Sequence, residues 1–131
     1  MIITLELDSD SPIYLQIRNT IVAGIADGRL SPGEELPSVR NLAKELGINL
    51  HTVNKAYSVL KQEGFITIVR NKGVKVSETI KEGGSAALTG SVLDQLMLAA
   101  AEARAGGISR AEYLKLCAKS YDHYISRRDM T

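Results

Sequence analysis

Two neighbouring segments with the same apolar spacing constrain the fold of this chain most. In each segment, four apolar residues lie at positions i, i+3, i+4 and i+7, which places them on one face of a helix. The two sets are Val39, Leu42, Ala43 and Leu46, and then Val53, Ala56, Tyr57 and Leu60. Between them, Gly47 suits a left-handed helix end and Asn49 suits the N-cap of the second helix. Two short helices joined by a tight turn that contains glycine predict a helix-turn-helix.

The flanking segments predict a winged form of this motif. Ahead of it, Ser11 and Pro12 suit the N-cap and first position of a helix that ends at Gly28, with an isoleucine every fourth residue. Alternating apolar residues in 3–7 permit a short strand before that helix. After the motif, residues 65–69 and 74–76 suit two strands, and the polar residues 70–73 suit the turn between them. A helix, a helix-turn-helix and a β-hairpin with a basic tip follow one another as in a winged helix.

The last third of the chain predicts a second helical unit. Residues 78–90 have the composition of a linker, and Ser91 suits the N-cap of a helix that ends at Gly106-Gly107. Its apolar face is Val92, Leu96, Ala99 and Ala103. Ser109 and Glu112 then form a capping box before a second apolar series. This series has heptad-like spacing and consists of Ala111, Leu114, Ala118, Tyr121 and Ile125. A lone two-helix hairpin is marginal, so we expect it to pack on another surface.

These patterns together predict an α+β fold that is mainly α. We expect a winged helix-turn-helix in residues 1–77, a linker in 78–90 and a helical hairpin in 91–131.

The positive charge of the chain is concentrated in the predicted winged helix. The whole chain of 131 residues has a formal net charge of +1. Residues 28–77 carry eight Lys or Arg and four Asp or Glu, a net charge of +4, whereas residues 1–27 carry −3 and residues 78–131 sum to zero. A cationic segment on such a scaffold suits an anionic partner, although a solvated surface also accounts for it.

The second helix of the motif presents a polar face opposite its apolar one. At 100° per residue, this face holds His51, Asn54, Lys55, Ser58 and Gln62. Such side chains read base edges in a major groove, and Lys, Arg and helix N-termini bind phosphates. Each residue also has a plainer explanation: Asn49 caps the helix, while His51 and Lys55 are solvated.

The candidate contacts outside this helix are weaker when taken singly. Arg40 follows the expected cap Ser38, where a basic residue opposes the helix dipole, and this suits an anionic partner. The basic residues of the hairpin tip also keep a strand edge soluble.

Other classes of function find little support in the sequence. The two histidines, His51 and His123, fall in different predicted units, and Cys117 lies beside the apolar seam as a packing residue. There is no glycine-rich phosphate loop, no HExxH motif and no paired Cys or His metal spacing. No apolar run approaches the roughly 20 residues that span a bilayer, and the N-terminus does not resemble a secretion signal. We expect a cytoplasmic protein without enzymatic activity, metal or cofactor.

The matching residues resemble the GntR family of bacterial transcription regulators over about residues 10–77. The resemblance rests on residues 12–17, on the Pro32-Gly33-Glu34-Glu35-Leu36-Pro37-Ser38-Val39-Arg40 run, and on residues 49–57 and 60–66. The short helical tail is similar to the YtrA-like subfamily, which implies that it dimerises. The resemblance further implies that Arg40 touches the phosphate backbone, that Asn49, His51, Thr52 and Asn54 read bases, and that Arg70 to Gly73 enter the minor groove. Leu50 stands where many relatives have arginine, and Asn71-Lys72-Gly73-Val74 replaces a glycine-rich wing.

We therefore expect a homodimeric repressor that binds a palindromic operator in double-stranded DNA. Its recognition helix is about 49–62 and its wing about 70–73. The candidate DNA-binding residues are Ser38, Arg40, Asn49, Leu50, His51, Thr52, Asn54, Lys55, Arg70, Asn71, Lys72 and Gly73. The two apolar series of residues 91–131 are the candidate dimerisation residues. The alternative is a winged-helix adaptor that binds proteins through an apolar recognition face. The sequence does not indicate a small-molecule effector.

Overall fold

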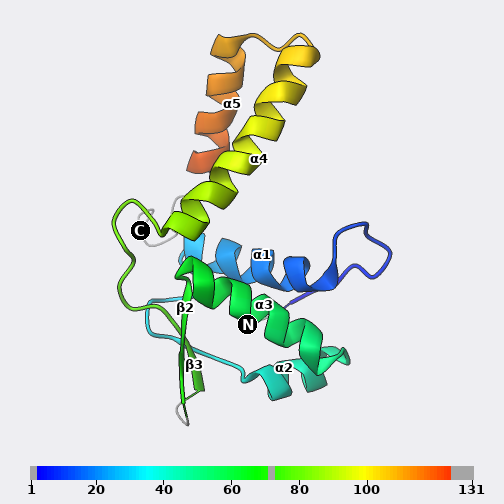
Figure 1. Cartoon of the computed structure of the whole chain (residues 1–131), viewed down its shortest axis with the longest axis vertical. Helices are drawn as coiled ribbons and strands as arrows, with labels where there is room; N and C mark the ends of the chain where they lie inside the picture. The colour runs from blue at the N-terminus through cyan, green and yellow to red at the C-terminus, as the bar shows by residue number, and fades with distance from the viewer. Residues whose placement is uncertain (1–2, 71–72, 125–131) are drawn as a thin grey trace.

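The structure is a computed structural model that describes residues 3–70 and 73–124. Its elements are α1 (Ile13–Ala26), β1 (Glu35–Leu36), α2 (Val39–Leu46), α3 (Leu50–Glu63), β2 (Ile66–Val69), β3 (Gly73–Val76), α4 (Ala86–Ala105) and α5 (Arg110–Asp122). The first six elements pack together, and α4 and α5 extend from them as a hairpin along the long axis (Figure 1). This is the expected mainly helical α+β fold, a winged helix-turn-helix followed by a helical hairpin.

The apolar core joins the three N-terminal helices to the sheet. On α3, all four residues of the predicted apolar face are fully buried: Val53, Ala56, Tyr57 and Leu60. They meet Ile17 and Ile21 of α1 and Leu42 of α2 in one cluster, which Val76 of β3 also joins. The helical period read from the sequence is therefore confirmed, because the same residues that share a face also share the core.

Side chains and a glycine close the turn between α2 and α3 as predicted. The Ser38 hydroxyl accepts a hydrogen bond from the backbone N–H of Asn41 at 3.1 Å, which caps α2. Gly47 ends α2 at φ +66°, a left-handed conformation that favours glycine. Asn49 Oδ1 then accepts from the backbone N–H of His51 at 2.7 Å and caps α3.

The sheet contains the predicted hairpin and one strand that the sequence did not predict. Strands β2 and β3 are antiparallel, with Ile66 opposite Val76 and Val69 opposite Gly73. Strand β1 pairs with the other edge of β3, which gives the order β1-β3-β2. Two residues carry no alternating pattern, so β1 exists because β3 offers it hydrogen bonds. Residues 71 and 72 of the hairpin tip lie outside the described part of the chain.

The structure corrects two predicted helix starts and one predicted strand. Helix α1 begins at Ile13 with Pro12, not Ser11, at the N-cap position. The segment before it is not a strand: the Gln16 amide bonds both the N–H and the C=O of Glu6, at 2.8 and 3.0 Å. Helix α4 begins at Ala86 with Ser85 as its N-cap, so Ser91 lies inside the helix. Ser85 is the N-cap in place of Ser91 because its hydroxyl forms hydrogen bonds with both α3 and α4. The connection from β3 to α4 is therefore shorter than predicted.

Candidate nucleic-acid interface

The outer face of α3 is polar and open to solvent. His51, Asn54, Lys55 and Ser58 are all exposed on the side opposite the buried residues of the helix. Together they offer hydrogen-bond donors and acceptors, the groups that distinguish base pairs in a major groove. Leu50, at the first position of the helix, is 44% exposed and is the apolar exception on this side.

Asn49 and Thr52 differ from these residues in their surroundings. The Oδ1 atom of Asn49 is engaged in the helix cap, although the side chain is exposed. The capping explanation is therefore correct for this atom, and the amide nitrogen of Asn49 is the group that can meet a base. Thr52 is half-buried at the flank of the helix.

Lys55 has a neighbour that the sequence did not predict. Its Nζ lies 4.1 Å from the centroid of the Tyr14 ring in α1, a cation–π contact. This contact holds the ammonium at the edge of the polar face, next to the start of α1. It joins residues 41 positions apart, so a pattern along the chain gives no signal for it; the crossing of α1 over α3 creates it.

Arg40 is exposed at the second position of α2. The segment that leads into α2 is tied to α3 through Tyr57, whose hydroxyl donates to the carbonyl oxygen of Pro37 at 2.7 Å. Ser38 follows Pro37 directly and caps α2. The bond therefore positions the start of α2, and with it Arg40, relative to the recognition helix.

The Tyr57 hydroxyl gives a first prediction. Tyr57→Phe keeps the ring in the core and removes one buried hydrogen bond, so we expect the free energy of unfolding to fall by about 1–2 kcal/mol. Urea denaturation measures this loss, and Tyr124→Phe, on an exposed residue, is the control. Burial, with the Glu45 charge as a smaller cause, raises the pKa of the Tyr57 phenol. The stability this group contributes is therefore present below its ordinary pKa of about 10 and lost as the pH rises above it. An unchanged free energy of unfolding in Tyr57→Phe would contradict the role of this bond.

Two of the four wing residues named by the sequence lie in the described part of the chain. Arg70, directly after β2, and Gly73, at the start of β3, are both exposed. Asn71 and Lys72 fall between them and outside the described residues. Figure 1 shows α2, the end of β2 and the start of β3 at the end of the molecule away from α4 and α5. Helix α2, which contains Arg40, and the two described wing residues therefore belong to the same end.

The predicted dimerisation residues separate into two groups. Three of the four α4 residues face α5 within the same chain: Ala103 is buried, and Leu96, Ala99 and Ala103 line a groove of about 400 Å³ between the helices. Val92 is exposed and does not line this groove. The α5 side of this groove is formed by Tyr113, Leu116 and Cys117, and the Tyr113 hydroxyl donates to the carbonyl oxygen of Leu96 at 3.1 Å. The seam picked from the sequence did not include these three residues.

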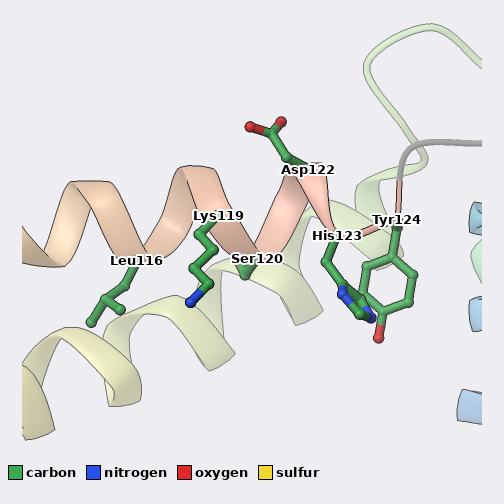
Figure 2. Close-up of a pocket in the computed structure, with 6 residues that line it drawn as sticks. All are labelled: Leu116, Lys119, Ser120, Asp122, His123 and Tyr124. Carbon is green, nitrogen blue, oxygen red and sulfur yellow. The ribbon is translucent and has the colours of Figure 1, made fainter.

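The described α5 members of the set are exposed and do not line this groove, namely Ala111, Leu114, Ala118 and Tyr121. Tyr121 lines a separate pocket with Val92 and Leu93 of α4. Ile125 lies outside the described residues. A second pocket is found at the C-terminal end of α5 (Figure 2). Leu116, Lys119 and Ser120 point toward α4 there, whereas Asp122 points to the opposite side. The His123 and Tyr124 rings at this end meet edge to face, with centroids 4.8 Å apart.

Within residues 3–70 and 73–124, no three His, Cys, Asp or Glu side chains are grouped so as to hold a metal ion. None of the helices described there has the length and apolar character needed to cross a membrane.

Comparison with known proteins agrees with the winged-helix geometry. Residues 13–76 match the family of bacterial regulatory proteins called the gntR family. The solved structure of YtrA from Sulfolobus acidocaldarius, a GntR-family transcription factor, is 35% identical to this chain and has a TM-score of 0.59. The match covers 92% of this chain and 97% of that one. The chain belongs to this family.

The chain is also similar to a curated repressor and to a further solved structure. The HTH-type transcriptional repressor YtrA of Bacillus subtilis (strain 168) is 40% identical over 79 residues, which are 60% of this chain and 61% of that protein. The chain thus spans less than two thirds of the length of this curated relative. A transcriptional antiterminator from Listeria monocytogenes EGD-e has a TM-score of 0.81 at 27% identity, over 95% of this chain and 93% of that one. The chain is a YtrA-like member of the GntR family.

Proposed function

We propose that this GntR regulator is a homodimeric repressor in the cytoplasm that binds a palindromic operator with two winged helices. The observation that carries the proposal is the exposed polar face of α3, with His51, Asn54 and Lys55 opposite a fully buried apolar face. The same segment of the chain, residues 28–77, holds the net charge of +4. Repression then follows from occupying DNA that the transcription machinery needs.

Different elements make the contacts to bases and the contacts to phosphates. At the start of α3, Asn49, His51, Thr52 and Asn54 read bases in the major groove, and exposed Leu50 suits an apolar contact with a thymine methyl group. Phosphates are met by the start of α2 and by the edge of the recognition helix, through Ser38, Arg40 and Lys55. The wing, Arg70 to Gly73, lies in the minor groove.

The exposed apolar surface of the helical hairpin supports a dimer. Leu93, Met97 and Leu98 of α4 are each more than half exposed, and Leu114 of α5 is nearly so. A soluble monomer rarely leaves so many large apolar side chains in water on one small unit. Two copies that join through this surface have twofold symmetry, so their reading heads match a palindrome. The helical hairpin thereby acts as the dimerisation module, joined to the winged helix by the shorter connection.

The alternative of a protein-binding adaptor requires an apolar recognition face, and this chain exposes one apolar residue there. Selection from a random double-stranded DNA library with the full chain tests the proposal. We expect enrichment of one palindromic sequence with two half-sites. Recovery of DNA without any common sequence would contradict specific operator binding and favour the adaptor.

Arg40 gives the second prediction. Arg40→Ala removes one phosphate contact, so we expect weaker binding to all DNA sequences and a slope of log K against log salt that is smaller by about one per protomer. Fluorescence anisotropy titrations over a range of salt concentrations measure this slope. Lys81→Ala is the matched control, because it removes the same charge from the exposed segment before α4. A slope equal to that of the wild type would remove Arg40 from the interface.

A further inference from the structure

The start of α4 is anchored on the last residue of the recognition helix. The Ser85 hydroxyl donates a hydrogen bond to the backbone carbonyl oxygen of Glu63 at 3.0 Å. The same hydroxyl accepts from the backbone N–H of Leu88 at 3.1 Å. A hydroxyl has one donor hydrogen and two acceptor lone pairs, so both bonds form together. One side chain therefore caps α4 and ties it to α3.

The residue that Ser85 bonds is itself firmly held. The Glu63 side chain is 8% exposed, and its carboxylate accepts two hydrogen bonds from the Arg18 guanidinium of α1, at 2.9 and 3.1 Å. That guanidinium also lies 5.6 Å from the centroid of the Phe65 ring. The end of α3 is thus fixed to α1 by a paired, two-point contact. A bond to the Glu63 carbonyl is consequently a bond to the body of the winged helix.

The rest of the connection does little to orient α4. Residues 78–82 before it are exposed, and Gly83 and Gly84 both have positive φ, at 80° and 78°. A cleft of about 350 Å³ lies between α1 and the helical hairpin, with Ala23 on one side and Gln95 and Tyr124 on the other. The hairpin is therefore not packed against α1 along this cleft. Among the described residues, the Ser85 hydroxyl makes the hydrogen bond between α3 and α4.

A small change in the angle at which α4 leaves α3 displaces the far end of α4 by a large distance. The helix has 20 residues and so a length of about 30 Å, at 1.5 Å per residue. A rotation of about 10° moves its far end by about 5 Å, which exceeds the roughly 3.4 Å rise of one base pair.

We propose that Ser85, through the Glu63 carbonyl, sets the angle between the recognition helix and α4 and thereby the half-site spacing that the dimer accepts. This inference rests on the proposed function, in which the hairpin joins two reading heads. Ser85 does not touch DNA; it is a positioning residue.

Substitutions at Ser85 separate capping from bridging. In Ser85→Asp, the carboxylate still caps α4, because it accepts from the Leu88 N–H, but it has no hydrogen to donate to the Glu63 carbonyl. Ser85→Thr keeps both functions and is the matched control. The probes are DNA duplexes with two copies of the half-site that the full-length wild type selects, separated by spacers that increase in single base pairs over about one helical turn, roughly 10 base pairs. A duplex with a single half-site reports on the recognition helix alone.

We expect the wild type and Ser85→Thr to prefer one spacing by about tenfold or more over its neighbours. Ser85→Asp should lose this preference to within about threefold, or shift it by at least one base pair, while its affinity for the single half-site stays within about twofold. Ser85→Asp with the spacing profile of the wild type overturns the inference. The inference is also overturned if Ser85→Asp loses as much affinity for the single half-site as it loses for the duplexes with two half-sites. That result places the damage in the recognition helix.

A misfolded variant and a wild type without a preferred spacing would each have a distinct meaning. If circular dichroism or sedimentation shows that Ser85→Asp is not a folded dimer, Ser85→Gly replaces it, since glycine is tolerated at an N-cap and has no hydroxyl. If the wild type is monomeric or shows no preferred spacing, the proposed function itself fails. That result is distinct from a wild type with a preferred spacing that Ser85 does not influence, which contradicts this inference alone.

Discussion

A chain that ends after Ser77 is expected to be a monomer that binds two-half-site DNA about 10²- to 10⁴-fold more weakly than the full chain. The loss follows from avidity, because two linked heads bind the second half-site as an intramolecular step. The fragment keeps its fold in this prediction, since the core cluster is drawn from residues 17–76, that is, from α1, α2, α3, the sheet and Leu30 between α1 and β1. None of the buried residues in that cluster comes from α4 or α5.

Analytical ultracentrifugation and anisotropy titration measure the two parts of this prediction. On a duplex with one half-site, the fragment and the full chain should bind equally, and this comparison is the control for folding. Leu114→Glu in the full chain should weaken dimers in the same direction, because Leu114 is 47% exposed on the outer face of α5. A fragment that still sediments as a dimer would show that the helical hairpin is not the dimerisation module.

Glu63→Ala is expected to lower the free energy of unfolding by about 3 kcal/mol, the lower end of the range for breaking a buried ion pair. The substitution leaves the Arg18 guanidinium, with a side chain only 13% exposed, without its carboxylate. The cost is therefore mainly that of a charge held away from water without its partner. The pair joins α1 to the end of α3, so its loss weakens the scaffold of the recognition helix.

Chemical denaturation measures this loss, and two variants make the result specific. Glu82→Ala removes an exposed carboxylate and should change the free energy of unfolding by no more than about 0.5 kcal/mol. The double variant Arg18→Met with Glu63→Leu replaces both charges by apolar groups and should recover most of the stability. A Glu63→Ala protein as stable as the Glu82→Ala control would show that the pair contributes little.

Much of the winged helix could be predicted because its signals are local. The caps at Ser38 and Asn49 and the helix end at Gly47 depend on a few neighbouring residues, and the structure has all three. The polar face of α3 follows from the buried one by rotation about a single helix. For these features, the periodicity of the chain contains the physical cause.

Local patterns led to errors where several residues compete for one task. Ser91 and Ser85 both suit an N-cap. Helix α4 begins after Ser85 because the Ser85 hydroxyl also donates a hydrogen bond to the carbonyl oxygen of Glu63, a residue distant in the sequence. The alternation in residues 3–7 suits a strand, but none of the described strands pairs with it and the Gln16 amide binds that backbone instead. Within the chain, α4 packs on Tyr113 and Cys117 next to the α5 seam, and pairing of that seam with a second copy stays a prediction.

The sequence by itself determined where the helices lie, which of their faces are buried, and that the positive charge is placed on the winged helix. These properties depend on spacing and composition, which folding leaves unchanged. The tertiary structure alone decided which distant groups meet: Lys55 with Tyr14, Arg18 with Glu63, and Ser85 with the end of α3. Each contact needs two elements to cross at a given angle. That angle results from the packing of the whole core, and no stretch of the chain specifies it alone.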